Sequence, residues 1–96
     1  MILRFEWNKV KAEENLKKHN VSFDEASTVF QDTLACIFYD GVHSVGEMRE
    51  IIIGHSIIGR LLIISFTEKA KNIVRIISAR QVTRREKREY EENRNI

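Results

Sequence analysis

The fold of this chain is decided by the stretch REIIIGHSIIGRLLIISFTEKAKNIVRIISAR, residues 49–80. It holds three runs rich in isoleucine, leucine and valine, residue types that favour strands. We predict strands over 47–55, 60–67 and 73–80, the first two joined as a hairpin by residues 56–59. Neighbouring positions in these runs are apolar, which is typical of strands covered on both faces. The sequence therefore predicts a twisted, mainly antiparallel sheet with protein on both sides.

The residues before this stretch predict a short strand, two helices and a further strand. Residues 2–7 alternate loosely between apolar and polar, and Asn8 is a good N-cap for a helix over 9–19. Residues 22–25, Ser-Phe-Asp-Glu, fit a capping box, in which the serine oxygen and the glutamate carboxylate each satisfy a free amide of the first turn. Residues 34–39 are β-branched and aromatic, so we expect a strand there.

The C-terminal segment predicts a helix with little apolar surface. Residues 83–86, Thr-Arg-Arg-Glu, form a second capping box, and the helix should run toward Asn93 with Tyr90 as its only large apolar residue. Such a helix is either solvated and joined by pairs such as Arg85 with Glu89, or packs on another molecule. We therefore expect a partner chain to cover the second face of the sheet.

Together these elements predict one α+β domain over residues 1–96. It should have two N-terminal helices, a mainly antiparallel twisted sheet of about four strands, and a C-terminal helix. A chain of 96 residues can build only one core. We expect that core to contain Phe5, Phe23, Phe30, Ile52, Leu62, Ile64 and Ile76.

Composition excludes several classes of protein. The chain has 16 Lys and Arg against 14 Asp and Glu, a net charge of +2, so any affinity for nucleic acid must come from local clusters. One cysteine excludes a disulfide scaffold within the monomer. A signal peptide is not recognisable, and no run approaches the roughly 20 apolar residues of a membrane span. We therefore expect a cytoplasmic protein that makes no contact with membranes.

Metal and cofactor sites are not expected. His19, His43 and His55 lack the spacing of metal ligands on one helix face, and no Cys-x-x-Cys accompanies them. The glycines do not form a phosphate-binding loop, and the Gly-x-Ser-x-Gly motif of serine hydrolases is absent.

Four arginines, by contrast, lie on or at the ends of the predicted central strands. An arginine on a sheet of isoleucine and leucine needs an anionic partner, and for any one of them that partner could be a neighbouring glutamate. Several together favour a phosphate, which the planar guanidinium group binds through two oxygens. The four are Arg49, Arg60, Arg75 and Arg80.

Strand alternation limits this interpretation. Arg75 and Arg80 point to opposite faces of a regular strand, so they share a face only if the strand bulges or ends before Arg80. We expect it to end.

Lys18 and His19 close the first predicted helix. A cation in the last turn is favoured by the helix dipole, so C-terminal capping explains both residues. The alternative is proton transfer near a bound phosphate, because histidine titrates near neutral pH.

Several motifs give the chain a family resemblance. They resemble those of the BrnT toxins of bacterial type II toxin-antitoxin systems over nearly the whole chain. The motifs are Trp7-Asn8-x-x-Lys11, Asn15-x-x-Lys18-His19-x-Val21-x-Phe23-x-x-Ala26, Arg49-x-x-x-x-Gly54, Gly59-Arg60-x-Leu62, Phe66-Thr67, Arg75-Ile76-Ile77-Ser78-Ala79-Arg80 and Glu86-x-x-x-Tyr90.

This resemblance implies a RelE-like fold and a ribonuclease activity that stops translation. It also implies neutralisation by a BrnA-type antitoxin with a ribbon-helix-helix part, so that operator DNA would be contacted only through the antitoxin. Two departures stand out. Asn8 occupies a position where the family often has Asp, and residues 40–46 are in a variable segment.

The groups present allow metal-free cleavage of RNA, in which a 2′-hydroxyl attacks the adjacent phosphorus. We assign phosphate clamping to Arg60 and Arg75, with Arg80 secondary, and proton transfer to Lys18 or His19. The alternative is a non-catalytic module that only binds RNA or protein. An enzyme should lose cleavage and keep its fold when one arginine is removed, whereas a binding module should never cleave.

Overall fold

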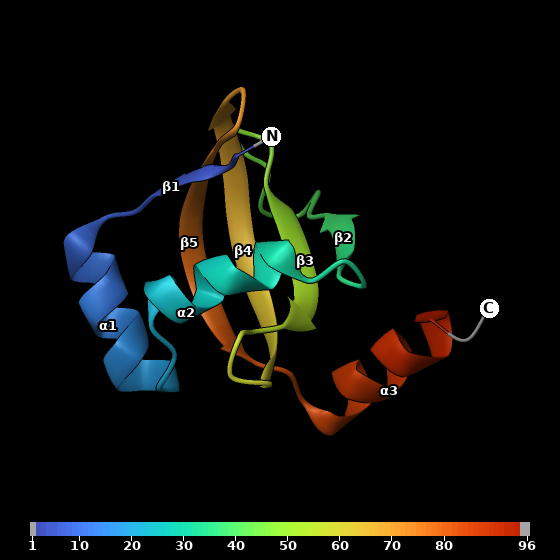
Figure 1. Ribbon diagram of the computed structural model, residues 1–96. Helices are drawn as coiled ribbons and strands as arrows, with labels where there is room; N and C mark the ends of the chain where they lie inside the picture. The colour runs from blue at the N-terminus through green and yellow to red at the C-terminus, as the bar shows by residue number, and fades with distance from the viewer. Residues whose placement is uncertain (1, 95–96) are drawn as a thin grey trace.

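A computed structural model describes residues 2–94 of the chain and confirms the α+β class (Figure 1). The chain order begins with a strand and two helices and ends with a helix. The elements are β1 (Arg4–Glu6), α1 (Lys9–His19), α2 (Phe23–Thr28), a 3-10 turn (Val29–Gln31), β2 (Cys36–Tyr39), β3 (Glu50–His55), β4 (Leu61–Ala70), β5 (Ile73–Gln81) and α3 (Arg84–Arg94).

The strands form a single mixed sheet in the order β1-β5-β4-β3-β2. The three pairings β2–β3, β3–β4 and β4–β5 are antiparallel, as predicted, and β3 and β4 form the expected hairpin. The short β1 adds a fifth strand, which runs parallel to β5 with Phe5 opposite Val74. The tight hairpin connection depends on Gly59, whose φ of 84° lies in the left-handed region that favours glycine.

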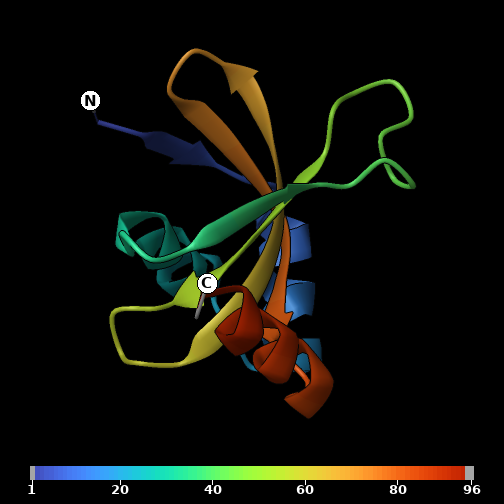
Figure 2. The same ribbon diagram turned by 90° about the vertical axis from the view of Figure 1, so that its right-hand side faces the viewer.

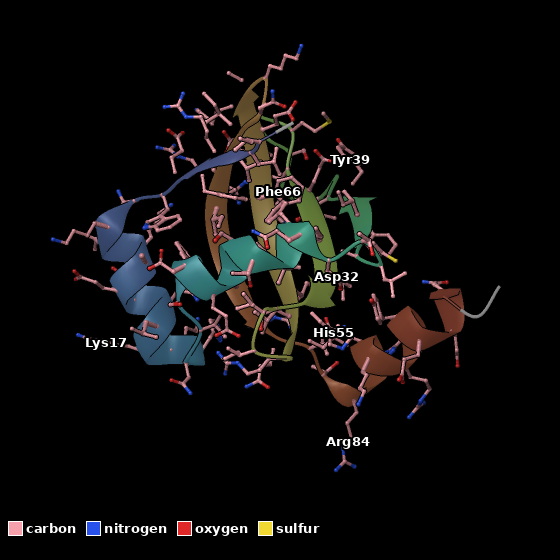
Figure 3. The ribbon with its side chains drawn as sticks, in the orientation of Figure 1. Lys17, Asp32, Tyr39, His55, Phe66 and Arg84 are labelled. Carbon is pink, nitrogen blue, oxygen red and sulfur yellow. The ribbon has the colours of Figure 1, made fainter. Side chains whose placement is uncertain are left out.

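The core lies between the sheet and the two N-terminal helices, on what we call the near face. In Figure 1, α2 crosses in front of the sheet and α1 lies beside β5. Phe66 lies between the sheet and α2 (Figure 3), with its ring centroid 5.0 Å from that of Phe30. Five predicted core residues are confirmed as buried, and Phe5 and Phe30 pack against them partly exposed. The five are Phe23, Ile52, Leu62, Ile64 and Ile76.

The inward stripe of α1 contains a buried asparagine that explains its polar character. The amide nitrogen of Asn15 donates to the carbonyls of Val21 and Ala79 at 2.9 and 2.8 Å, and its oxygen accepts from the Ala79 N–H at 3.1 Å. Asn15 therefore bonds α1 to the free edge of β5 in the way that a neighbouring strand would.

The far face of the sheet, which bears Ile53 and Ile63, is partly covered by α3 (Figure 2). Tyr90 is only 3% exposed; its hydroxyl donates to the Leu34 carbonyl at 3.2 Å, and its ring lies 6.2 Å from that of His55. As expected for a solvated helix, α3 is mostly exposed and has the predicted pair of Arg85 with Glu89, at 3.1 Å. Tyr90 also packs α3 on its own chain, which neither alternative included. One aromatic ring buries enough surface to dock a helix that is otherwise polar.

The capping boxes differ from each other. Thr83 and Glu86 exchange two hydrogen bonds, as predicted. Ser22 accepts from the Glu25 N–H, but the Glu25 carboxylate binds elsewhere. No helix that the structure describes is long and apolar enough to cross a membrane.

Candidate functional site

A β-bulge in β5 decides which side chains share the far face. β5 continues to Gln81, so the expectation that it ends before Arg80 is wrong. Ser78 is paired with Ser65 and Ile76 with Phe66, which leaves Ile77 as an extra residue. The extra residue shifts the alternation by one position.

The burial pattern shows the consequence of this shift. Val74 and Ile76 are buried before the bulge and Ala79 after it. Arg75 and Arg80 therefore emerge on the same side of the sheet, away from the core.

Three hollows meet at the bulge, and Ile77 lines all of them. One lies between α1 and β5 and is lined by Lys18 and His19. Another is lined by Lys11 and Arg75. The largest, of about 330 Å³, lies on the far face and is lined by Asp40, His43, Arg49, Ile51, Ile63, Ser65, Ile77, Ser78 and Arg80. The structure thus brings Lys18, His19, Arg75 and Arg80 around one bulge, which we call the bulge site.

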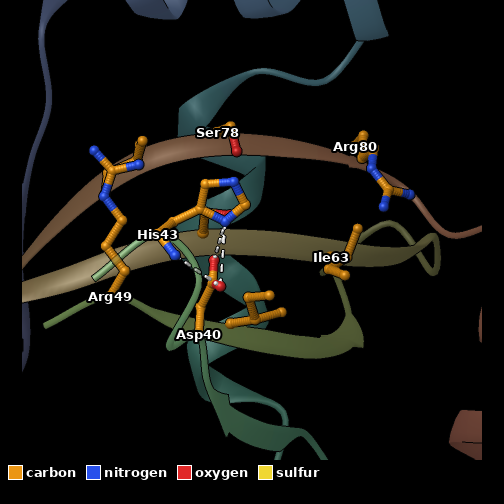
Figure 4. Close-up of a pocket in the computed structure, with 9 residues that line it drawn as sticks. Asp40, His43, Arg49, Ile63, Ser78 and Arg80 are labelled. Carbon is orange, nitrogen blue, oxygen red and sulfur yellow. Dashed lines mark hydrogen bonds and ion pairs between the residues drawn. The ribbon is translucent and has the colours of Figure 1, made fainter. Parts of the chain in front are cut away.

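The far-face cavity contains a histidine and a carboxylate in direct contact (Figure 4). His43 Nδ1 lies 2.9 Å from Asp40 Oδ2 and 3.2 Å from Oδ1. Arg49 lines the same cavity. Its buried Nε has no hydrogen-bond partner within residues 2–94 and lies 3.6 Å from Glu47 Oε1. An arginine with a donor to spare is suited to an anionic ligand.

Arg80 is held by a bidentate ion pair with α3. Its two terminal nitrogens donate to the Glu86 carboxylate at 2.8 and 2.9 Å. These bonds lower the pKa of Glu86 from its usual 4.5 to about 2, despite the opposing effect of partial burial. The pair positions Arg80 and ties the start of α3 to β5.

We expect this pair to make stability depend on pH in the acid range. A carboxyl whose folded pKa is depressed stabilises the fold above its unfolded pKa of 4.5, and that contribution disappears as the pH falls toward 2. The free energy of unfolding should therefore fall more steeply between these values in the wild type than in Glu86→Gln. Urea unfolding at a series of pH values measures this, and equal slopes would contradict the assignment.

Arg75 is more accessible than Arg80. Its Nε lies 3.7 Å from Glu6 Oε1, and both side chains are nearly half exposed, at 45% and 46%. Exposed pairs of this kind contribute little to stability. Arg75 can therefore turn to a ligand without disturbing the fold.

Arg60 lies apart from this group. It directly precedes β4, and its guanidinium group donates to both oxygens of Glu25 and to the Asn20 carbonyl, on the near face. Ser56 also donates to the Glu25 carboxylate, at 2.7 Å. Hydrogen bonding from Arg60 is the main cause that lowers the pKa of Glu25. Arg60 is thus one of the arginines whose partner is a glutamate, and its geometry favours a structural role over the phosphate clamping expected of it.

We expect Arg60→Ala to lower the melting temperature by several degrees. The substitution leaves the Glu25 carboxylate, only 11% exposed, without its cation, and it removes one of the links between the β3–β4 hairpin and α2. Thermal melts of Arg60→Ala and of Arg85→Ala, whose arginine is 86% exposed, make the comparison. A melting temperature equal to that of the wild type would return Arg60 to the list of candidate phosphate ligands.

Sequence reasoning did not select Asp40 and His43, and it left Arg49 without a role. These residues meet because the Asp40 N–H donates to the Arg49 carbonyl, which extends the β2–β3 pairing beyond Tyr39. The Asp-Gly-x-His spacing was the available signal, since an aspartate at a turn often accepts from the amide two or three residues on. The structure has that bond, from the His43 N–H to Asp40 at 3.3 Å.

Comparison with known proteins gives the family. The sequence model of the family described as the ribonuclease toxin BrnT of type II toxin-antitoxin systems matches residues 7–86. The 1.1 Å crystal structure of the Brucella abortus ribonuclease toxin BrnT superposes with a TM-score of 0.66, over 85% of this chain and 99% of that chain. At 18% identity, this likeness shows the fold alone. No functionally curated protein matches the sequence. Because the family match spans most of its length, the chain belongs to the BrnT family of ribonuclease toxins of type II toxin-antitoxin systems.

Proposed function

We propose that this protein is a metal-independent endoribonuclease that inhibits translation by cutting RNA at the bulge site. The observation that carries the proposal is the bulge at Ile77, which brings Arg75 and Arg80 to one face of the sheet. The hollows that these arginines line share Ile77 with the hollow lined by Lys18 and His19 of α1. Clustered cations that keep N–H donors for a ligand are suited to the RNA backbone. Family membership supplies the reaction class.

The residues of the bulge site can support transesterification. The 2′-oxygen of RNA attacks the adjacent phosphorus, the bond from phosphorus to the 5′-oxygen breaks, and a 2′,3′-cyclic phosphate and a 5′-hydroxyl result. Arg75 would bind the phosphate and stabilise the charge that develops on it, with Arg80 secondary. Lys18 or His19 would transfer a proton, since both line the hollow between α1 and β5.

The donor set supports metal independence. Among residues 2–94, no group of three or more His, Cys, Asp or Glu side chains is placed to hold a metal ion. Arginine and lysine can stabilise negative charge in the transition state without a metal ion.

The test is to incubate the purified protein with RNA in excess EDTA and to identify the new ends. We expect cleavage that leaves 2′,3′-cyclic phosphate and 5′-hydroxyl ends. Cleavage that stops with EDTA and returns with a divalent cation would contradict the metal-independent mechanism. RNA binding without cleavage would favour the alternative, a non-catalytic RNA-binding or protein-binding module.

A BrnA-type antitoxin is the proposed partner. The edge strand β2 exposes three large apolar side chains, Ile37, Phe38 and Tyr39, at 55%, 41% and 65%. A protein segment that covers β2 would bury them and pair with its free edge. Operator DNA would then be contacted through the antitoxin. Co-expression should yield a complex, and three polar substitutions at these positions should abolish it.

A further inference from the structure

The far-face cavity offers a second histidine as a proton acceptor, and this one is in contact with a carboxylate. The side chains of Lys18 and His19 lie on the α1 side of β5, whereas His43 and Asp40 lie on the side of β4 and β3, and both groups line hollows that share Ile77 and Ser78. An in-line displacement at phosphorus needs its base and its acid on opposite sides of the phosphate. The bulge separates the two groups in this way.

We propose that His43, oriented by Asp40, is the general base that takes the proton of the 2′-hydroxyl. The inference rests on the proposed ribonuclease function. It also assigns the far-face cavity to the nucleotide that carries the attacking hydroxyl.

The hydrogen bonds around Asp40 determine the tautomer of neutral His43. With Nδ1 2.9 Å from a carboxylate oxygen, the neutral ring carries its proton on Nδ1 and presents the lone pair of Nε2. Asp40 is itself held, because its N–H donates to the Arg49 carbonyl at 2.9 Å and its carbonyl accepts from the Ser44 hydroxyl at 2.5 Å. The Asp40 side chain is 13% exposed and that of His43 is 65% exposed. The orienting group is therefore fixed while the base remains open to a ligand.

The other charged groups of the cavity can hold a phosphate next to this base. Arg49 has its buried Nε without a hydrogen-bond partner in the described residues. Arg80 uses three of its N–H bonds on Glu86 and the Gln81 carbonyl, which leaves two of its five for a ligand. Asp40, Arg49 and Arg80 are thus the charged groups that line the cavity with His43. The two guanidinium groups attract the anionic substrate, and Asp40 maintains the tautomer.

The step balances without a co-reactant. Nε2 of neutral His43 takes the 2′-hydroxyl proton as the 2′-oxygen forms its bond to phosphorus. The bond from phosphorus to the 5′-oxygen then breaks, and that oxygen takes a proton from Lys18 or His19. A later proton exchange with water restores both groups.

The test compares His43→Ala with the wild type and with the exposed-position control Arg85→Ala in the RNA cleavage assay in EDTA. His43→Ala should lower the cleavage rate at neutral pH by about 10²–10⁴-fold, the usual contribution of general base catalysis. In His43→Ala, the pH–rate profile should also lose its acid limb, the range in which protonation of the base stops the reaction. Added imidazole should restore part of the activity, which a structural defect would not allow. Asp40→Asn should also lower the rate.

The cleavage rates of the wild type and of His43→Ala together distinguish a failure of the His43 assignment from a failure of the proposed ribonuclease function. If the wild type cleaves RNA and His43→Ala keeps both the wild-type rate and the acid limb, the inference is overturned while the proposed function stands. If the wild type does not cleave, both fail. Nitrogen NMR of the imidazole gives a readout independent of activity. A proton on Nδ1 in the wild type that moves to Nε2 in Asp40→Asn supports the assignment, and a proton on Nε2 in the wild type contradicts it.

Discussion

Arg75→Ala is expected to lower RNA cleavage by about 10²–10³-fold, the cost of removing one donor to transition-state charge. The melting temperature should stay nearly unchanged, because the only ion pair found for Arg75 among the described residues is the exposed contact with Glu6 at 3.7 Å. Cleavage of a labelled RNA under single-turnover conditions, with a thermal melt of the same preparation, measures both quantities.

The matched control for Arg75→Ala is Arg85→Ala, which removes the same charge from an exposed position on α3. It should leave cleavage close to the wild-type rate. Two results would contradict the assignment of Arg75. In one, Arg75→Ala cuts RNA normally; in the other, it loses activity only because it melts below the assay temperature.

Asn15→Ala should lower the free energy of unfolding by at least about 3 kcal/mol. Its side chain satisfies three buried main-chain groups, and each group left unpaired costs about 1–3 kcal/mol. Two of them belong to Ala79, one residue after the paired Ser78, so the substitution should also loosen the bulge site. Urea unfolding measures the loss of stability directly.

Lys17→Ala on the same helix is the control for Asn15→Ala. Lys17 is exposed (Figure 3), so its truncation should change stability by no more than about 0.5 kcal/mol. A cost for Asn15→Ala as small as that of Lys17→Ala would mean that water replaces the amide. The bond between α1 and β5 would then not depend on Asn15.

Much of the fold could be predicted because local chemistry and tertiary structure agree there. The caps Asn8 and Thr83 accept from amides of α1 and α3 as their sequence positions predict. The apolar runs of β3, β4 and β5 form the centre of the sheet. The docking of α3 was missed because a count of apolar residues gives little weight to one tyrosine, although Tyr90 alone is almost fully buried.

The candidate site was harder to predict because it depends on long-range pairing. The bulge at Ile77 arises from the register between β4 and β5, and without it Arg75 and Arg80 would point to opposite faces. The partner of Arg60 is Glu25, which lies 35 residues away in the sequence. Only the packing of α2 brings the two side chains together. Lys18 and His19 reach the bulge site because Asn15 fixes α1 on the edge of β5, a role not readable from residue type.

The position of bound RNA on the protein decides whether the bulge site holds the substrate. A short RNA made uncleavable by 2′-O-methylation can be titrated into isotope-labelled protein and followed by NMR. We predict the largest shifts at the amides of Ile77 and Ser78 and at the side chains of Arg75 and His43, with saturable binding that weakens as salt increases. Shifts confined to the surroundings of Arg60 and Glu25, with the bulge unaffected, would contradict this prediction.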